Sequence, residues 1–248
     1  MSEQLVPHKP LSTVKPAHLI FVGGFLGAGK TTAMAALARR LLQDGLNIGL
    51  VTNDHADEMV DSALISRFGM PVAEVSGGCF GCEFNDLLDA TERVLLQEPD
   101  VLIAEPVASC ADTVATVILP LKRFYGGVFR IAPFSVLIDP MRLYAMLLEE
   151  SPSEFARSFA PIFHRQLEEA DILVLNKVDK LSTEEAHRLI EALRQHHPNK
   201  PILAISALRG DGVEEWMQMV LQEAPPARGC WKRRTTACTR SAARSWAG

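Results

Sequence analysis

The sequence of 248 residues predicts an α/β fold, in which a mostly parallel sheet carries helices on both faces. Short, nearly continuous apolar runs alternate with longer segments of helical periodicity, which is typical of strands buried on both faces. A glycine-rich turn joins the first apolar run to the first helical segment. The predicted first helix spans residues 31–43, and the predicted strands span 18–22, 48–52, 101–104, 134–138, 172–175 and 202–205.

Composition limits the classes of protein that this chain can represent. It is 48% hydrophobic and 22% charged, which suits one large core, and its net charge of −5 gives no general case for binding nucleic acid. No apolar run reaches the roughly 18 to 20 residues that a membrane-spanning helix needs, and the polar start lacks a secretory signal. We therefore expect a cytoplasmic protein that acts without a membrane, whose five cysteines are metal ligands or core thiols rather than disulfides.

Three segments follow from the pattern along the chain. Residues 1–17 contain three prolines and predict an extended lead-in, and residues 18–224 hold the α/β domain. Residues 225–248 carry six Arg or Lys and no acidic residue, without helical or alternating periodicity. We expect this basic tail to be irregular and solvated, with binding of RNA or acidic lipid as the alternative.

The glycine-rich turn carries the first functional motif. Residues 24–31, GFLGAGKT, match GxxxxGK[ST], with a predicted strand before them and a helix after them. Such a P-loop points backbone N–H groups at phosphates, while Lys30 reaches the β- and γ-phosphates and the Thr31 hydroxyl binds Mg²⁺. The alternative is a turn that merely links strand to helix. The expected nucleotide-binding residues here are Gly24, Gly27, Ala28, Gly29, Lys30, Thr31 and Thr32.

A second motif indicates which base is bound. Asn176, Lys177 and Asp179 follow the strand predicted at 172–175, and Ser206 and Ala207 follow the next one. Guanine presents an N1–H and a 2-amino group side by side, so the Asp179 carboxylate accepts from both, whereas adenine lacks that amino group. The predicted ligand is therefore GTP or GDP with Mg²⁺.

Together these blocks resemble the CobW-type branch of metal-handling P-loop GTPases, relatives of the urease and hydrogenase accessory GTPases. The resemblance covers roughly residues 18–222 and includes the segments GGFLGAGKTT at 23–32, SGGCFGC at 76–82 and ADILVLNKVD at 170–179. It implies a GTPase that binds a transition metal near its switch loops and delivers it to a client metalloprotein or a cobalamin-type pathway. A homodimer is left open.

The cysteine loop is the candidate metal site. Cys79 and Cys82 precede a predicted helix, and two soft thiolates favour Zn²⁺, with Co²⁺, Ni²⁺ or Fe as further candidates. The family pattern resembles Cys-x-Cys-Cys, but Gly81 stands at its middle cysteine. The additional candidate ligands lie in the first switch segment: Asp54, His55 and Asp57. A buried thiol pair, or an acidic loop that assists Mg²⁺ indirectly, is the alternative.

Glu105 is the third expected catalytic residue beside Lys30 and Thr31. It ends the strand predicted at 101–104, where an acid can hold Mg²⁺ through water or orient the attacking water. The resemblance implies glycine three residues later, but Ala108 stands there, so we expect slow turnover. Cys110 is expected to pack in the core rather than bind metal.

The expected function is thus a GTP-hydrolysing metallochaperone. The alternatives are a regulatory or RNA-associated GTPase with a structural cysteine pair, and a nucleotide-binding remnant with little turnover. The resemblance also implies a further C-terminal domain, which appears missing or truncated. The change of composition at Pro225 motivates the hypothesis of a frameshift, which sequencing of the locus would test.

Overall fold

A computed structural model describes residue 11 and residues 15–53, 70–76, 78–148 and 153–222. The candidate ligands Asp54, His55 and Asp57 lie outside the described residues, as do the basic tail at 225–248 and most of the lead-in. Within the described ranges, none of the helices combines the length and the apolarity needed to cross a membrane.

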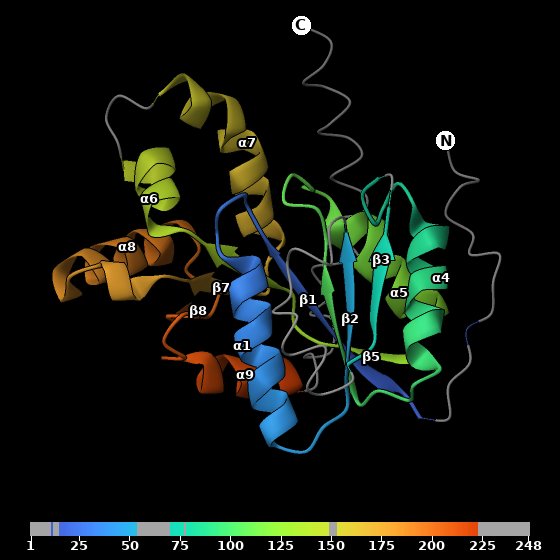
Figure 1. Cartoon of the computed structure of the whole chain (residues 1–248). Helices are drawn as coiled ribbons and strands as arrows, with labels where there is room; N and C mark the ends of the chain where they lie inside the picture. The colour runs from blue at the N-terminus through green and yellow to red at the C-terminus, as the bar shows by residue number, and fades with distance from the viewer. Residues whose placement is uncertain (1–10, 12–14, 54–69, 77, 149–152, 223–248) are drawn as a thin grey trace, which may run out of the picture.

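The described strands form one parallel sheet (Figure 1). Its order is β3-β2-β4-β1-β6-β7-β8, and β5 pairs with the beginning of β1. All six predicted strands are present, and the predicted α/β class is confirmed. The bounds are β1 Ala17–Gly24, β2 Ile48–Asn53, β3 Val72–Val75, β4 Val101–Glu105, β5 Phe129–Ile131, β6 Ser135–Ile138, β7 Ile172–Leu175 and β8 Ile202–Ala204.

Two strands were not expected from the sequence. β3 is an edge strand of four residues whose side chains are alternately buried and half-exposed, and β5 has only three residues. Each contains a charged residue, Glu74 in β3 and Arg130 in β5, so neither forms the continuous apolar run by which the other strands were predicted. Pairing with β2 stabilises β3 and pairing with β1 stabilises β5, although their own sequences do not predict strands.

The helices cover both faces of the sheet, as predicted. α1 and α9 pack together on one face, while α4, α5, α7 and α8 contribute to the apolar layer on the other. Two π-helical segments, η1 and η2, and one 3₁₀ turn, η3, complete the order. The bounds are α1 Lys30–Gln43, α4 Phe84–Leu95, η1 Val114–Ile118, α5 Leu119–Phe124, α6 Pro140–Leu143, η2 Tyr144–Leu148, α7 Glu154–Glu169, η3 Val178–Lys180, α8 Thr183–His196 and α9 Val213–Leu221.

Alternation along β1 divides the core into two layers. Ile20 and Val22 pack in the layer beneath α1 and α9, whereas Leu19 and Phe21 pack in the opposite layer. This period of two is what a strand buried on both faces requires. Trp216 of α9 is fully buried in the first layer and donates its indole N–H to the Ser135 hydroxyl at 3.0 Å.

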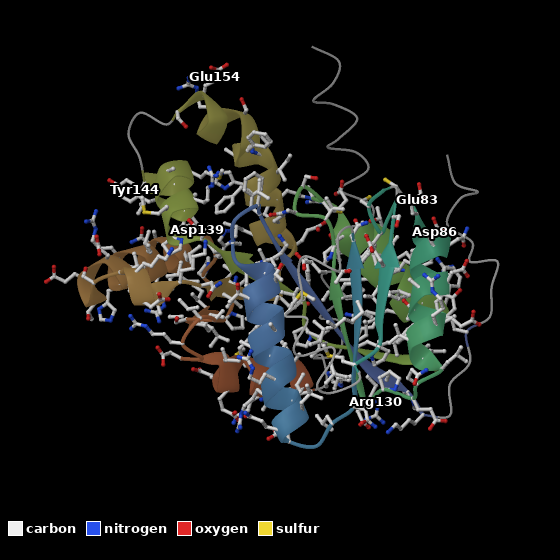
Figure 2. All side chains as sticks on the ribbon, viewed as in Figure 1. Glu83, Asp86, Arg130, Asp139, Tyr144 and Glu154 are labelled. Carbon is white, nitrogen blue, oxygen red and sulfur yellow. The ribbon has the colours of Figure 1, made fainter. Side chains whose placement is uncertain are left out.

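The parallel arrangement gathers the candidate residues at one edge. Gly24, Glu105 and Asp139 all stand at carboxyl ends of strands or directly after them, where ligands bind in open α/β sheets. Figure 2 shows Asp139 and Glu83 near the upper edge of the sheet, with Arg130 of β5 at the opposite end. The strand order reverses between β4 and β6, on either side of β1, which makes the end of β1 the switch point.

Gly24 provides a test of this architecture. Its φ is +137°, and a Cβ there would lie 2.4 Å from the Leu137 carbonyl oxygen of neighbouring β6. We expect Gly24→Ala to lower the free energy of unfolding by at least about 2 kcal/mol, because both the backbone conformation and the close approach exclude a side chain.

Urea denaturation measures this loss. Gly127→Ala is the matched control, because a Cβ at Gly127 would meet nothing within 4 Å. Equal stability of the two variants would contradict the expected strain.

Candidate functional site

The glycine loop between β1 and α1 is held by residues far away in sequence. Gly27 and Gly29 both have φ of +83°, the left-handed conformation that glycine adopts freely. The Asn176 side-chain N–H donates to the Ala28 carbonyl at 2.9 Å, and the Lys177 ammonium donates to the Gly27 carbonyl. No side chain caps the start of α1, and its first turn contains no acid, so its N–H groups suit an anion.

Lys30 and Glu105 form a buried ion pair below this loop. Their nitrogen and oxygen lie 3.6 Å apart, and the two residues are 8% and 4% exposed. Burial lowers the pKa of Lys30 and raises the pKa of Glu105, and in each case the partner's charge offsets part of the shift. Lys30 is thus positioned at the start of α1 with one counter-charge.

Three polar atoms at the ends of β2 and β4 are buried without a hydrogen-bond partner among the described residues: Thr52 Oγ1, Asn53 Oδ1 and Glu105 Oε2. Buried polar atoms in native proteins almost always have a partner, which can be water or an ion. Oxygen donors of this kind fit Mg²⁺ and its bound waters. The site therefore fits the expected cation, with Thr31 at the start of α1 as the other donor.

The residues of the second motif form one hydrogen-bonded unit. Asn176 Oδ1 accepts from the Ala207 N–H at 3.0 Å, while its amino group holds the glycine loop. The Ser206 hydroxyl donates to Asp179 Oδ1 at 2.6 Å, which lowers the pKa of that partly exposed carboxyl. The Asp179 carboxylate is thus ionised and oriented. It can accept two hydrogen bonds side by side, as guanine recognition requires.

A pocket continues from this unit along α1. It is lined by Thr31, Thr32, Arg39, Ala207 and Leu208, among others. The start of α1 and the loop after β8 thus form two walls of one hollow, although the two segments are about 175 residues apart in the chain. Thr32 and Ala207 were both expected from sequence to bind nucleotide, and the fold brings them together.

Lys177 joins the motif to a further acid. Its ammonium forms an ion pair with Asp139 at 2.8 Å, and Asp139 also caps α6 by accepting from the N–H groups of Met141 and Arg142. Lys177 itself has φ of +60°. This conformation turns its side chain across the glycine loop, where it contacts the Gly27 carbonyl.

The cysteine loop lies before α4, as expected. The sulfurs of Cys79 and Cys82 are 2.9 Å apart, and the Cys82 N–H donates to the Cys79 sulfur at 3.2 Å. Partial burial alone raises the pKa of Cys79, but hydrogen bonds from Cys82 and Gly81 outweigh it and leave the pKa below its ordinary value. The pKa of Cys82 is raised, because its thiol donates to Cys79 and faces the charge on that sulfur.

Cys110 is not packed in the core, contrary to the expectation from sequence. It is half-buried in the loop after β4, near enough to Cys79 to help lower the pKa of that thiol. The Gln166 amino group holds this loop by donating to the carbonyl groups of Ala108 and Cys110, each at 2.8 Å. Sequence reasoning missed this proximity because 31 positions separate the two cysteines. Cys110 follows the predicted strand β4, whereas Cys79 follows β3, which was not predicted, so the sequence carried only half of the signal.

Gly81, which replaces the middle cysteine, is tightly confined. A Cβ at this position would lie 2.3 Å from Thr116 Oγ1 and 2.7 Å from its Cβ. Thr116 is held in η1 by its hydrogen bond to the Asp112 carbonyl at 2.7 Å. Among the residues with described placement, no three or more His, Cys, Asp or Glu side chains are grouped so that they would hold a metal ion. The cysteine pair is thus an open site rather than a closed one.

Asn53 connects the cysteine loop to the nucleotide edge. Its side-chain amino group donates to the carbonyl groups of Val75 at 2.8 Å and Gly78 at 2.7 Å. Asn53 ends β2, and β2 pairs directly with β4, which ends in Glu105. A displacement at the end of β2 would therefore be transmitted to the loop that holds the two sulfurs.

Comparisons with known proteins agree with this arrangement. The sequence pattern of one family, described as "CobW/HypB/UreG, nucleotide-binding domain", matches residues 18–204. Zinc chaperone CobW of Sinorhizobium sp is 29% identical over 218 residues, covering 77% of this chain and 58% of that protein. Hydrogenase maturation factor HypB of Escherichia coli strain K12 is 26% identical over 195 residues, with the same two coverages of 77% and 58%.

The chain thus spans less than two thirds of the length of these curated relatives. Among solved structures, Hydrogenase Maturation Factor HypB from Archaeoglobus fulgidus has a TM-score of 0.53 at 18% identity. The match covers 82% of this chain and 87% of that one. This likeness shows a shared fold and confirms the predicted P-loop architecture.

A buried carboxyl on α7 makes stability depend on pH. Burial raises the pKa of Glu169 to about 7, although Glu169 accepts from the Val114 N–H at 3.5 Å and lies 3.8 Å from Arg165. Its stabilising contribution is therefore full below the unfolded-state value near 4.5 and is lost as pH rises through about 7.

The wild type should lose about 2 to 3 kcal/mol of its free energy of unfolding between pH 5 and pH 8, and we expect Glu169→Gln not to show this loss. The amide stays neutral over this range and still accepts a hydrogen bond from the Val114 N–H. Denaturant unfolding at both pH values measures it. Glu168→Gln, a change on an exposed neighbour, is the control, and an identical pH profile for all three proteins would refute the assignment.

Proposed function

Because the chain belongs to the CobW/HypB/UreG nucleotide-binding domain family, we propose that it is a GTP-binding and GTP-hydrolysing metallochaperone. The observation that carries this proposal is the link through Asn53, which ties the cysteine loop to the edge that holds the candidate nucleotide site. The cargo is a transition metal, and a client metalloprotein or a metal-insertion pathway receives it.

Preference for guanine rests on the unit around Asn176. Asn176 holds the glycine loop and the Ala207 N–H at once, so the phosphate loop and the base loop keep one relative position. Asp179 presents an oriented carboxylate to the N1–H and the 2-amino group of guanine. Adenine lacks the amino group and would leave one acceptor of this carboxylate without a partner.

Hydrolysis is proposed as in-line attack of water on the γ-phosphate. Lys30 turns from Glu105 toward the phosphates, and the N–H groups of the glycine loop and of the α1 N-terminus stabilise the charge that develops there. Thr31 and Glu105 would hold Mg²⁺, which neutralises phosphate charge when bound. Glu105, freed from Lys30, also orients the attacking water. Slow turnover is expected, since no arginine or glutamine is assigned to the reaction.

The metal is proposed to bind first at Cys79 and Cys82. Their contact at 2.9 Å and the lowered pKa of Cys79 favour a Cys79 thiolate that captures a soft cation such as Zn²⁺, with Co²⁺, Ni²⁺ or Fe as competitors, and Cys82 releases its proton when the metal binds. The three thiols are not grouped as a metal site in the structure itself, so we propose that metal binding draws Cys110, which lies near Cys79, to the pair as a third sulfur in place of the side chain that Gly81 lacks. Asp54, His55 and Asp57 remain candidates from sequence for the fourth ligand.

Coupling between the two ligands follows from this connectivity. Nucleotide binding draws Lys30 away from Glu105 and changes the end of β4, which pairs with β2. Asn53 at the end of β2 holds the Gly78 carbonyl directly before the first cysteine. Nucleotide state therefore shifts the geometry of the cysteine pair and with it the metal affinity.

Base recognition is tested by Asp179→Asn. The amide replaces one acceptor by a donor, so we expect affinity for GDP to fall at least about a hundredfold and affinity for xanthosine diphosphate to rise. Equilibrium titration with fluorescent nucleotides measures both. Asp179→Ala is the control: its affinity for GDP should fall, but its affinity for xanthosine diphosphate should not rise. Unchanged GDP affinity in Asp179→Asn would remove guanine recognition from this residue.

Metal binding is tested by titrating Zn²⁺, Co²⁺, Ni²⁺ and Fe²⁺ under reducing conditions, with GDP or a nonhydrolysable GTP analogue bound. We expect Cys79→Ser/Cys82→Ser to lower Zn²⁺ affinity at least about a hundredfold and Cys110→Ser about tenfold, because thiolates bind Zn²⁺ far better than hydroxyls. GDP affinity is the internal control and should not change. Equal metal affinity in both nucleotide states would contradict coupling, and metal binding that is indifferent to the cysteines would contradict the site.

A further inference from the structure

Thr52 is an unusual residue for its place in the sheet. It is the fifth residue of β2, it has no solvent exposure, and its hydroxyl has no hydrogen-bond partner among the described residues. Ile48, Leu50 and Val51 on the same strand are buried apolar residues. An unpaired hydroxyl in such a position costs about 1 to 3 kcal/mol, whereas valine would fill the same volume without that cost.

The neighbour of Thr52 on the adjacent strand is Glu105. The two residues are register partners in the parallel pair of β2 and β4, whose ribbons lie side by side in Figure 1. Leu50 and Ile103, two residues earlier on each strand, both pack in the layer beneath α1, so Thr52 and Glu105 emerge on that same face. Glu105 Oε2 also lacks a partner there.

Under the proposed function, nucleotide binding changes which group pairs with the Glu105 carboxylate. Its other carboxylate oxygen, Oε1, faces the Lys30 ammonium at 3.6 Å, which is the counter-charge of this buried group. Phosphates attract the same ammonium, and a buried carboxylate that loses its counter-charge needs a hydrogen-bond donor in its place. The Thr52 hydroxyl is a donor at the adjacent register position.

We propose that Thr52 is a positioning residue for Glu105, which accepts the Thr52 hydroxyl hydrogen once Lys30 has turned to the phosphates. This inference rests on the proposed nucleotide function. In the structure Lys30 holds Glu105 through Oε1, and neither Glu105 Oε2 nor the Thr52 hydroxyl has a partner among the described residues, so the bond forms only once Glu105 moves from Lys30. The bond would hold Glu105 ionised and oriented toward the cation, so Thr52 acts on Mg²⁺ through Glu105 rather than by contact.

The test compares Thr52→Val with Thr52→Ser. Two measurements are made on each protein: the Mg²⁺ concentration needed for half-maximal GDP and GTP-analogue binding, and urea unfolding without nucleotide. We expect Thr52→Val to need about tenfold more Mg²⁺, which is the loss of one hydrogen bond to a charged group, and to be as stable as the wild type or more stable. Thr52→Ser keeps the donor and should need Mg²⁺ as the wild type does.

The Mg²⁺ requirement and the stability of Thr52→Val together distinguish a residue that positions Glu105 from one that only packs in the core. A structural threonine would give a destabilised valine variant with an unchanged Mg²⁺ requirement, and that result would overturn the inference. So would an equal rise in the Mg²⁺ requirement for valine and serine. Wild-type protein that binds no guanine nucleotide would overturn the proposed function and this inference with it, whereas normal wild-type binding with unaltered Thr52→Val overturns the inference alone.

Discussion

The side chain of Asn176 is the contact on which the rest of the site depends. Its amide donates to the Ala28 carbonyl and accepts from the Ala207 N–H, so one buried group joins the loops after β1, β7 and β8. Gly29 has to be glycine for this contact, since a Cβ there would lie 2.6 Å from the Asn176 amino group. The phosphate loop and the base loop are therefore fixed relative to each other before any ligand binds, which lowers the ordering cost of binding.

Below this junction the site contains charges and polar atoms that the described residues leave incompletely satisfied. Lys30 and Glu105 are almost fully buried and neutralise each other, while Glu105 Oε2 and the Thr52 hydroxyl lack partners among the described residues. A buried ion pair contributes little to stability by itself, because desolvation offsets its Coulomb energy. On the function proposed above, each partner would exchange the other for a phosphate, a cation or a neighbouring hydroxyl.

The cysteine loop follows a different constraint, that of space. Thr116 of η1 occupies the volume that a side chain at residue 81 would need, so the loop approaches η1 closely. The same packing places Cys110 beside Cys79, held through the Gln166 amino group.

The sequence by itself determined the parallel α/β class, six of the strands, the glycine loop and the candidate base-recognition residues, because each depends on local periodicity or on residues adjacent in the chain. It did not reveal β3 and β5, whose few residues become strands only by pairing with β2 and β1. Tertiary structure alone decided that Cys110 lies near Cys79 and that Asn53 links the cysteine loop to β2. It also placed Thr52 and Glu105 next to each other on the same face of the sheet. These relations join residues 22 to 53 positions apart, and only strand order and register bring such residues into contact.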